Sequence, residues 1–366
     1  MIFEDMLKRT PPRGTACSAP KKAMHLFANT RLEMQQYKNV LGAASSWPSY
    51  ITSTSDILNL NMHWLTFASV ACFASVNAHP SRRNDISCPT VFDGRVPISA
   101  TGATFVNGQL PYDPSYILGA NLTWADVLRF PAGARSLFDN SSSKAVEVTI
   151  DDRAIFTPSP DNRQVGFRRA ELLPKPVNAT DSATGLKTLH WSLKIDKSRP
   201  LNYSHEYQLV WLENQDYSAN QFTLGTGTPY GKNDTSRKEA KSLFLLGTSA
   251  SNPQQTLWKT PFTDGVWHNF GLVLDYNKNH VEVFYSKDGE PLTRKTKFLA
   301  NDLSNLGQYH FGVLKKPIGP PGIDITKQGF QPAGIHEGLA YGGTFEENSA
   351  GGCISTAPGV KGKKLN

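Results

Sequence analysis

Cysteine is scarce in this chain of 366 residues, and the positions of the four cysteines limit what their thiols can do. No two of them form the Cys-x-x-Cys pair used for zinc binding or thiol exchange; they are Cys17, Cys72, Cys88 and Cys353. The sequence also contains no Gly-x-Ser-x-Gly elbow, no phosphate-binding P-loop and no His-Glu-x-x-His. These absences argue against serine hydrolases, nucleotide-binding enzymes and zinc proteases.

Positive charge is only slightly in excess of negative charge. The chain has 38 Lys and Arg against 31 Asp and Glu, a formal net charge of +7. The basic residues are scattered and often accompanied by acids, and the longest basic cluster lies in the C-terminal tail at 361–364. Such a diffuse excess does not form a binding patch, so we expect no nucleic-acid partner.

One apolar segment interrupts a polar N-terminal region. Residues 1–61 have no sustained periodicity, and we interpret them as a disordered leader or an extension of the gene model. Residues 62–78 form an apolar run that ends in Val76-Asn77-Ala78, a small-x-small pattern typical of a cleavage site. The run is shorter than the roughly 20 apolar residues of a membrane span. We therefore predict a signal peptide and a secreted, extracellular protein that does not associate with membranes.

Cleavage after Ala78 would leave two cysteines, Cys88 and Cys353, near the ends of the mature chain. Such a pair is typical of one disulfide that joins the ends of a single domain, with two free buried thiols as the alternative. Five glycosylation sequons follow the cleavage site and support an extracellular surface; they begin at Asn121, Asn140, Asn178, Asn202 and Asn233. His79 would become N-terminal, like the copper ligand of lytic polysaccharide monooxygenases, but 79–87 has the character of a flexible tail. We predict no metal and no cofactor.

Short strand patterns separated by turn residues fill residues 88–357. In 187–195, for example, alternate residues are apolar, and Asn277-Lys278-Asn279 between two strand patterns indicates a hairpin. The one helix candidate is 123–129. Further strands are expected at 145–150, 166–172, 205–213, 220–224, 242–246, 267–276, 280–286, 308–314 and 335–345. With 29 Gly, 24 Pro and no internal repeat, the pattern predicts one all-β domain, a jelly-roll β-sandwich of antiparallel strands.

Acidic and aromatic side chains gather on two of the expected strands. Arg169 and Glu171 are two residues apart and point to the same face of a strand. The same alternation at 205–213 gives one face to His205, Tyr207, Leu209, Trp211 and Glu213. His310 would join them if the three strands are neighbours. Because a charged pair is costly to bury, we expect this face to be an open, wet cleft.

Paired carboxylates are what glycoside hydrolysis requires, one as acid and one as base or nucleophile. We therefore predict that Glu171 and Glu213 are catalytic and that His310 assists them. The predicted substrate-binding residues are an arginine, which can orient a carboxylate, and rings on which sugars stack; they are Arg169, His205, Tyr207 and Trp211. Purely structural roles remain as alternatives for these acids. Arg169 and Glu171 could form a structural ion pair, and Glu213 could be a solvated acid in a turn. Glu346-Glu347 is interpreted as an exposed rim.

Over residues 88–357 the chain resembles fungal glycoside hydrolase family 131, a family of secreted β-glucanases. The resemblance is carried by 88–97, 166–172, 205–213, 309–313, 339–345 and Gly352-Cys353. It implies a jelly roll with a shallow open cleft that acts broadly on β-1,3-, β-1,6- and β-1,4-glucans without a metal. We expect a monomer that inverts the anomeric centre, which calls for carboxylates about 6.5–9.5 Å apart.

Two alternatives remain. Residues 169–172 and 309–313 also resemble the strand motifs of jelly-roll alginate lyases. Those lyases usually carry a tyrosine where Leu314 stands and a basic residue where Leu173 stands, and both departures argue against a uronate substrate. The other alternative is a non-catalytic glucan-binding lectin, which would need no acid pair. Residues 358–366 are expected to be a disordered tail.

Overall fold

The computed structural model describes residues 88–114, 119, 122–175, 179–231, 237–359 and 362–365. The predicted leader (1–61), signal peptide (62–78) and N-terminal tail (79–87) lie outside these residues. So do three of the five sequon asparagines, Asn121, Asn178 and Asn233. Within the described residues, no helix is both long enough and apolar enough to cross a membrane.

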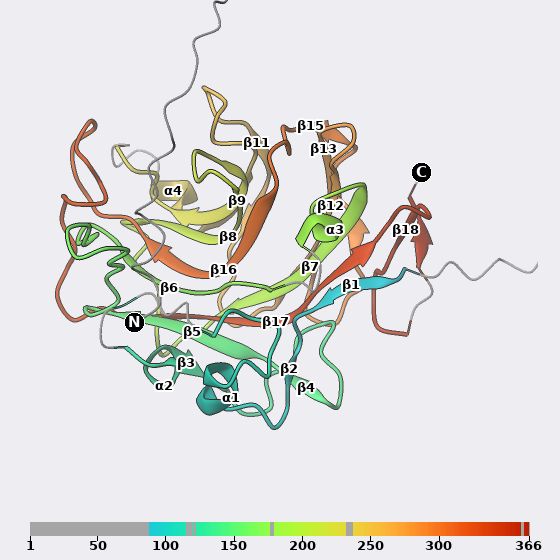
Figure 1. Ribbon diagram of the computed structural model, residues 1–366, viewed down its shortest axis with the longest axis horizontal. Coiled ribbons are helices and arrows are strands. Elements are labelled where there is room, and N and C mark those ends of the chain that lie inside the picture. Colours follow the sequence, from blue (N-terminus) through green and yellow to red (C-terminus); the bar gives the residue numbers. More distant parts are fainter. Residues whose placement is uncertain are drawn as a thin grey trace, which may run out of the picture. The chain divides into compact units, whose positions relative to one another are not determined.

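Two large antiparallel sheets make up most of the described chain (Figure 1). The nine-stranded sheet runs in the order β14 (Thr293–Arg294), β13 (His280–Lys287), β12 (His268–Asp275), β7 (Leu186–Ile195), β17 (His336–Asn348), β5 (Val146–Asp151) and β3 (Leu128–Arg129), with β1 (Thr90–Asp93) paired to β17 and β15 (Leu299–Ala300) paired to β13. The six-stranded sheet runs β11 (Thr256–Pro261), β10 (Ser242–Leu246), β9 (Asn220–Gly227), β8 (Glu206–Asn214), β16 (Gly307–Lys315) and β6 (Arg168–Leu172).

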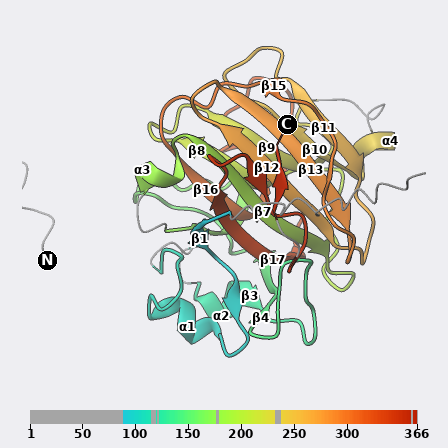
Figure 2. The same ribbon diagram turned by 90° about the vertical axis from the view of Figure 1, so that its right-hand side faces the viewer.

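Small elements complete the fold. Two short ribbons pair β2 (Val96–Pro97) with β4 (Ser143–Lys144) and β18 (Cys353–Ile354) with β19 (Lys363–Lys364). The helices of the described residues are all short: α1 (Gly102–Val106), α2 (Trp124–Val127), α3 (Ala179–Ser182) and α4 (Arg237–Ala240). Figures 1 and 2 both show α1, α2, β3 and β4 gathered together, and Figure 1 shows β2 and β5 beside them.

The apolar faces of the two sheets meet in one core. Trp191 of β7 stacks on Phe270 of β12 at 4.9 Å, and its ring also meets Phe311 of the opposite sheet at 6.5 Å. The same core cluster contains buried residues of β5, β7, β12 and β17 on one side and of β6, β8, β9 and β16 on the other. The predicted jelly-roll β-sandwich is confirmed, because alternation along each strand gives each sheet one apolar face.

A bulge in the six-stranded sheet decides which side chains reach the candidate site. Pairing between β16 and β8 shifts register between Phe311 and Leu314, and pairing between β8 and β9 shifts between Gln208 and Val210. The hydroxyl of Tyr341, on β17 of the other sheet, lies 2.9 Å from the Leu209 carbonyl oxygen and 2.6 Å from that of Gly312. It thus binds two carbonyls at the irregularity, where the regular ladder is interrupted.

The ends of the domain are tied together. Cys88 and Cys353 form the predicted disulfide, with their Cα atoms 5.8 Å apart. The expected disordered tail is wrong for residues 362–365, because β19 pairs with β18 and the Leu365 amide donates to the Gly352 carbonyl. The expected helix at 123–129 is also shorter than predicted, since Leu128–Arg129 form β3 and pair with β5.

Candidate functional site

Three neighbouring strands bring the predicted charged residues together. The strands β6, β16 and β8 are adjacent, with Glu171 opposite Gly312 and Trp211 opposite His310. Their alternate residues, Leu172, Phe311 and Leu212, belong to the core between the sheets. The side chains of Glu171, His310 and Trp211 therefore lie on the opposite side of the six-stranded sheet, which we call the outer face.

Glu171 is completely enclosed by its partners. Its side chain is 0 % exposed, and Arg169 binds both carboxylate oxygens, through Nε at 2.5 Å and Nη2 at 2.9 Å. His310 Nδ1 donates to Glu171 Oε2 at 2.9 Å. Such charge-assisted bonds from a guanidinium fork and an imidazole fix the carboxylate in one orientation.

His310 links Glu171 to the second predicted carboxylate. Its Nε2 lies 3.4 Å from Glu213 Oε2, and the Glu213 side chain is 27 % exposed. The ring of Trp211 stacks on the imidazole at 4.6 Å with an interplanar angle of 7°. The imidazole is thus held by a carboxylate at one nitrogen and by a ring across its face, with a solvent-accessible carboxylate near the other nitrogen.

The surroundings of these groups favour their charged forms. Burial alone would raise the pKa of Glu171, but the charge of Arg169 and the hydrogen bond and charge of His310 outweigh it and lower that pKa. Burial alone would lower the pKa of His310, but its bonds to Glu171 and Glu213 raise it above the ordinary 6.5. An ionised Glu171 beside a protonated His310 is therefore the favoured state at mildly acidic pH.

A glycine makes room for this arrangement. A Cβ added to Gly312 would lie 2.8 Å from Glu171 Cγ and would also collide with the Ala170 carbonyl oxygen. Only glycine at this position leaves room for the Glu171 side chain to lie over β16 and reach His310 on the same strand. Gly312 was not among the predicted site residues, although a glycine within a strand pattern is the signal for such a close approach.

Two of the predicted substrate-binding residues lie elsewhere. Because of the bulge, Tyr207 points into the core, where it is 0 % exposed and donates to Glu337 Oε2 at 2.8 Å. His205 precedes β8 and is buried, with Nδ1 2.7 Å from the Lys316 carbonyl oxygen. Burial lowers the pKa of His205 to about 4, so it is neutral at ordinary pH. The predicted strict alternation over 205–213 was wrong, because β8 contains one extra residue relative to β9 at the bulge.

Trp211 has a different role from the predicted sugar platform. It is only 2 % exposed and packs with Phe167, Leu314 and Ile325 in a small apolar cluster. It therefore supports the imidazole of His310 from within and offers no open ring face to a sugar. Gln308, which pairs with Glu213 across the strands, is instead exposed on the outer face and was missed by sequence analysis.

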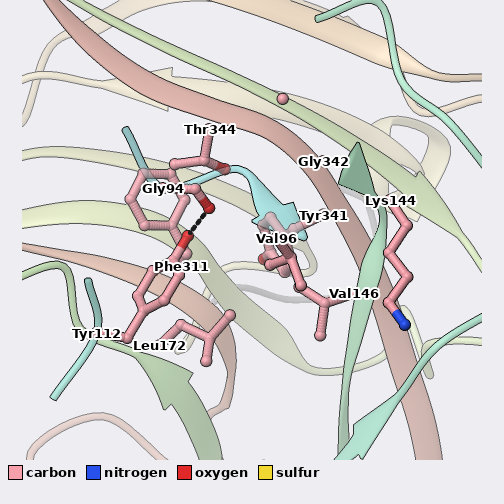
Figure 3. Close-up of a pocket in the computed structure, with 11 residues that line it drawn as sticks. Gly94, Val96, Tyr112, Lys144, Val146, Leu172, Phe311, Tyr341, Gly342 and Thr344 are labelled. Carbon is pink, nitrogen blue, oxygen red and sulfur yellow. Dashed lines mark hydrogen bonds between the residues drawn. The ribbon is translucent and has the colours of Figure 1, made fainter. Parts of the chain in front are cut away.

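A pocket elsewhere in the domain contains none of the residues of this cluster. Figure 3 shows a small pocket on the core side of the sheets, where the Tyr112 hydroxyl donates to the Gly94 carbonyl and Leu172 and Phe311 form part of the wall. Within the described residues, no three His, Cys, Asp or Glu side chains gather as a metal site. His79 lies outside those residues.

Comparison with known proteins gives a consistent result. The family model for the "Glycoside hydrolase 131 catalytic N-terminal domain" matches residues 90–352. A crystal structure of a GH131 β-glucanase catalytic domain from Podospora anserina is similar at 20 % identity and a TM-score of 0.57, covering 73 % of this chain and 98 % of that one. The catalytic domain of a family 131 protein from Coprinopsis cinerea is similar at 21 % identity and a TM-score of 0.56, covering 75 % and 99 %. A search of curated proteins found no match.

Proposed function

Since the chain belongs to glycoside hydrolase family 131, we propose that this glycoside hydrolase is secreted and cleaves β-1,3-, β-1,6- or β-1,4-linked glucans. The observation that carries the proposal is the row Arg169–Glu171–His310–Glu213 on the outer face. Two carboxylates joined through one imidazole supply the acid and base that hydrolysis of a glycosidic bond requires. The β-glucan substrate is supported by the similarity to the catalytic domain from Podospora anserina, which is a β-glucanase.

The spacing of the carboxylates favours inversion. Glu171 and Glu213 are separated by an imidazole ring, with a 2.9 Å hydrogen bond on one side and a 3.4 Å contact on the other. Retaining enzymes hold their carboxylates about 5–5.5 Å apart, whereas inverting enzymes leave about 6.5–9.5 Å for a water molecule. A ring between the two groups fits the wider spacing.

The two carboxylates have unequal roles in this proposal. Arg169 and His310 lower the pKa of Glu171, so Glu171 is the ionised base. Glu213, whose side chain reaches solvent, is the acid that protonates the leaving oxygen. Arg169 is 12 % exposed and covers Glu171, so the guanidinium must turn towards the sugar hydroxyls before water can reach the base.

Product analysis tests the reaction class. Purified protein is incubated with laminarin, a cellulosic glucan and alginate, and released reducing ends and unsaturated uronates are measured. We expect reducing ends from at least one glucan and no unsaturated product. An unsaturated product would instead indicate a lyase, and binding without any product would indicate a lectin.

Secretion is tested by the mass of the mature protein. Export with cleavage after Ala78 predicts a secreted chain that begins at His79 and carries N-linked glycans. Intact-mass analysis before and after enzymatic deglycosylation measures both features. A secreted form that retains residues 62–78 would contradict the proposed signal peptide.

A further inference from the structure

A second feature of the surface lies where β8 and β16 end. A cleft is formed by the turn after β8, the loop before β16, the segment after α3 and the turn between β12 and β13. Its walls include Gln215, Thr184, Asn277, Asn305 and Leu306. These residues come from four separate segments of the chain, so only the folded domain assembles the cleft.

The lining has the chemistry of a site for a neutral sugar. Nine described residues line the cleft, and none of them is charged. Amide and hydroxyl groups can donate to and accept from sugar hydroxyls. Leu306, which is 39 % exposed, and the half-buried ring of Tyr276 provide apolar surface for the carbon-bound faces of a pyranose. A uronate polymer would find no cation in this lining to neutralise its carboxylates.

Hydrogen bonds hold the walls of the cleft in place. Gln221 Nε2 donates to the carbonyls of Ser304 and Asn305 at 2.7 and 2.6 Å. The Leu303 amide donates to Asn279 Oδ1 at 3.0 Å, which ties this loop to the β12–β13 turn. The Tyr276 hydroxyl lies 2.9 Å from that of Tyr309. A wall fixed before binding loses little conformational entropy when a ligand is bound.

The cleft continues the strand that carries Glu213. Gln215, in the turn directly after β8, follows Glu213 by two residues, so their Cα atoms are at most about 7 Å apart. Gly307, next to the cleft residue Leu306, pairs with Asn214, and Gln308 pairs with Glu213. The ends of β8 and β16 therefore connect Glu213 to the cleft.

We propose that this cleft binds the part of a neutral glucan chain that extends beyond the bond being cleaved. The inference rests on the proposed function, since it takes Glu213 as the point from which the chain continues. It makes the enzyme bind a chain that continues past Glu213 more tightly than a chain that ends there, because only the continuing chain contacts Gln215 and Leu306.

The test compares long and short ligands in a double variant of the cleft. Asn277→Ala/Leu306→Ala is prepared in a Glu213→Gln background, which prevents turnover, and dissociation constants are measured by calorimetry for β-glucan oligosaccharides of increasing length. We expect binding of the longest oligosaccharides to weaken about five- to tenfold, since contacts of this kind each contribute modestly. Binding of the shortest ones stays unchanged.

A matched pair of exposed residues serves as the control. Ile98→Ala/Asn107→Ala removes the same kinds of side chain near β2 and α1, and it should change no dissociation constant. Equal affinity of the cleft variant and its background for long chains would overturn the inference, and so would a background protein that binds no glucan. If the cleft variant weakens long-chain binding but the wild-type protein releases no reducing ends, the proposed role of the cleft is supported and the proposed hydrolytic function is contradicted.

Discussion

Glu171 shows how a buried carboxylate can remain charged. Its side chain has no exposed surface, yet the guanidinium of Arg169 and the imidazole of His310 lower its pKa. A buried charge is tolerated only when it is paired and hydrogen-bonded, and here both oxygens have partners. The enclosure therefore sets the protonation state of the proposed base.

Replacing Arg169 with lysine should change the pH dependence of activity. An ammonium cannot bind both carboxylate oxygens as the guanidinium does, so the pKa of Glu171 rises. Because the base must be ionised, the acidic limb of the kcat/KM profile should move to higher pH. Activity at the optimum should fall about 10- to 100-fold, the effect of weakening a hydrogen bond to a charged group.

Arg199→Lys is the matched control for this measurement. Arg199 binds both oxygens of the buried Glu147 at 2.7 Å, and Glu147 is on β5 of the nine-stranded sheet, not on the sheet that carries the site. It should leave the acidic limb unmoved. An Arg169→Lys enzyme whose acidic limb lies at the same pH as that of wild type would show that Arg169 does not control the ionisation of the base.

The sequence correctly predicted which of the central residues share a face. Alternation put Arg169 and Glu171 on one face, and the condition that the strands of Glu171, Glu213 and His310 be neighbours is met in the sheet. It did not show that Trp211 would be covered by Phe167, Leu314 and Ile325, because those contacts join segments far apart in the chain.

At the scale of the elements, the bulge in β8 is the main departure from the expected pattern. It turns Tyr207 towards the core while Trp211 and Glu213 stay on the outer face. A one-residue change of register reverses the side of every residue beyond it. Nothing in the sequence of 205–213 marks the position of the extra residue, so strict alternation wrongly placed His205 and Tyr207 on the outer face.

Tyr207→Phe tests the corrected position. The variant loses the hydroxyl that donates to Glu337 and that accepts from the Asn202 amide at 3.0 Å. We expect the free energy of unfolding to fall by about 1–3 kcal/mol, because buried partners are left unsatisfied. The kcat/KM of the folded protein should stay within twofold of wild type. Loss of activity without loss of stability would instead show that Tyr207 acts at the substrate site.

At the scale of the whole molecule, two further acids are buried outside the proposed site. Glu346 and Glu347 were expected to form an exposed rim, but they are 0 % and 1 % exposed. Glu346 accepts from Ser182 and from the Tyr309 hydroxyl, and Glu347 contacts His190 Nε2 at 2.9 Å. The reason is the length of β17, whose C-terminal half is covered by other segments that local sequence does not reveal.

Glu346 should make stability depend on pH. Burial raises its pKa from 4.5 to about 7, so between these values the folded protein holds a proton that the unfolded chain has released. Stability from this group is therefore complete below pH 4.5 and is lost as the pH rises through about 7. The loss is at most about 3 kcal/mol.

Urea unfolding of wild type and Glu346→Gln across this pH range measures the effect. The difference between the two curves isolates Glu346 from other groups, such as His268, whose pKa burial lowers to about 4. We expect the wild-type free energy of unfolding to fall relative to the variant as the pH rises. Parallel curves would show that Glu346 is ionised in the folded protein.

The central claim is that Glu171 and Glu213 hydrolyse the β-glucan together. The most direct measurement is the rate of reducing-end release by Glu171→Gln and Glu213→Gln on the glucan that wild type cleaves. Glu337→Gln is the control, a buried glutamate that binds Lys315 and Tyr207 in the core. We predict that each site variant loses about 10²- to 10⁴-fold in kcat with its fold intact, while the control loses stability only. Wild-type kcat in either site variant would contradict the account.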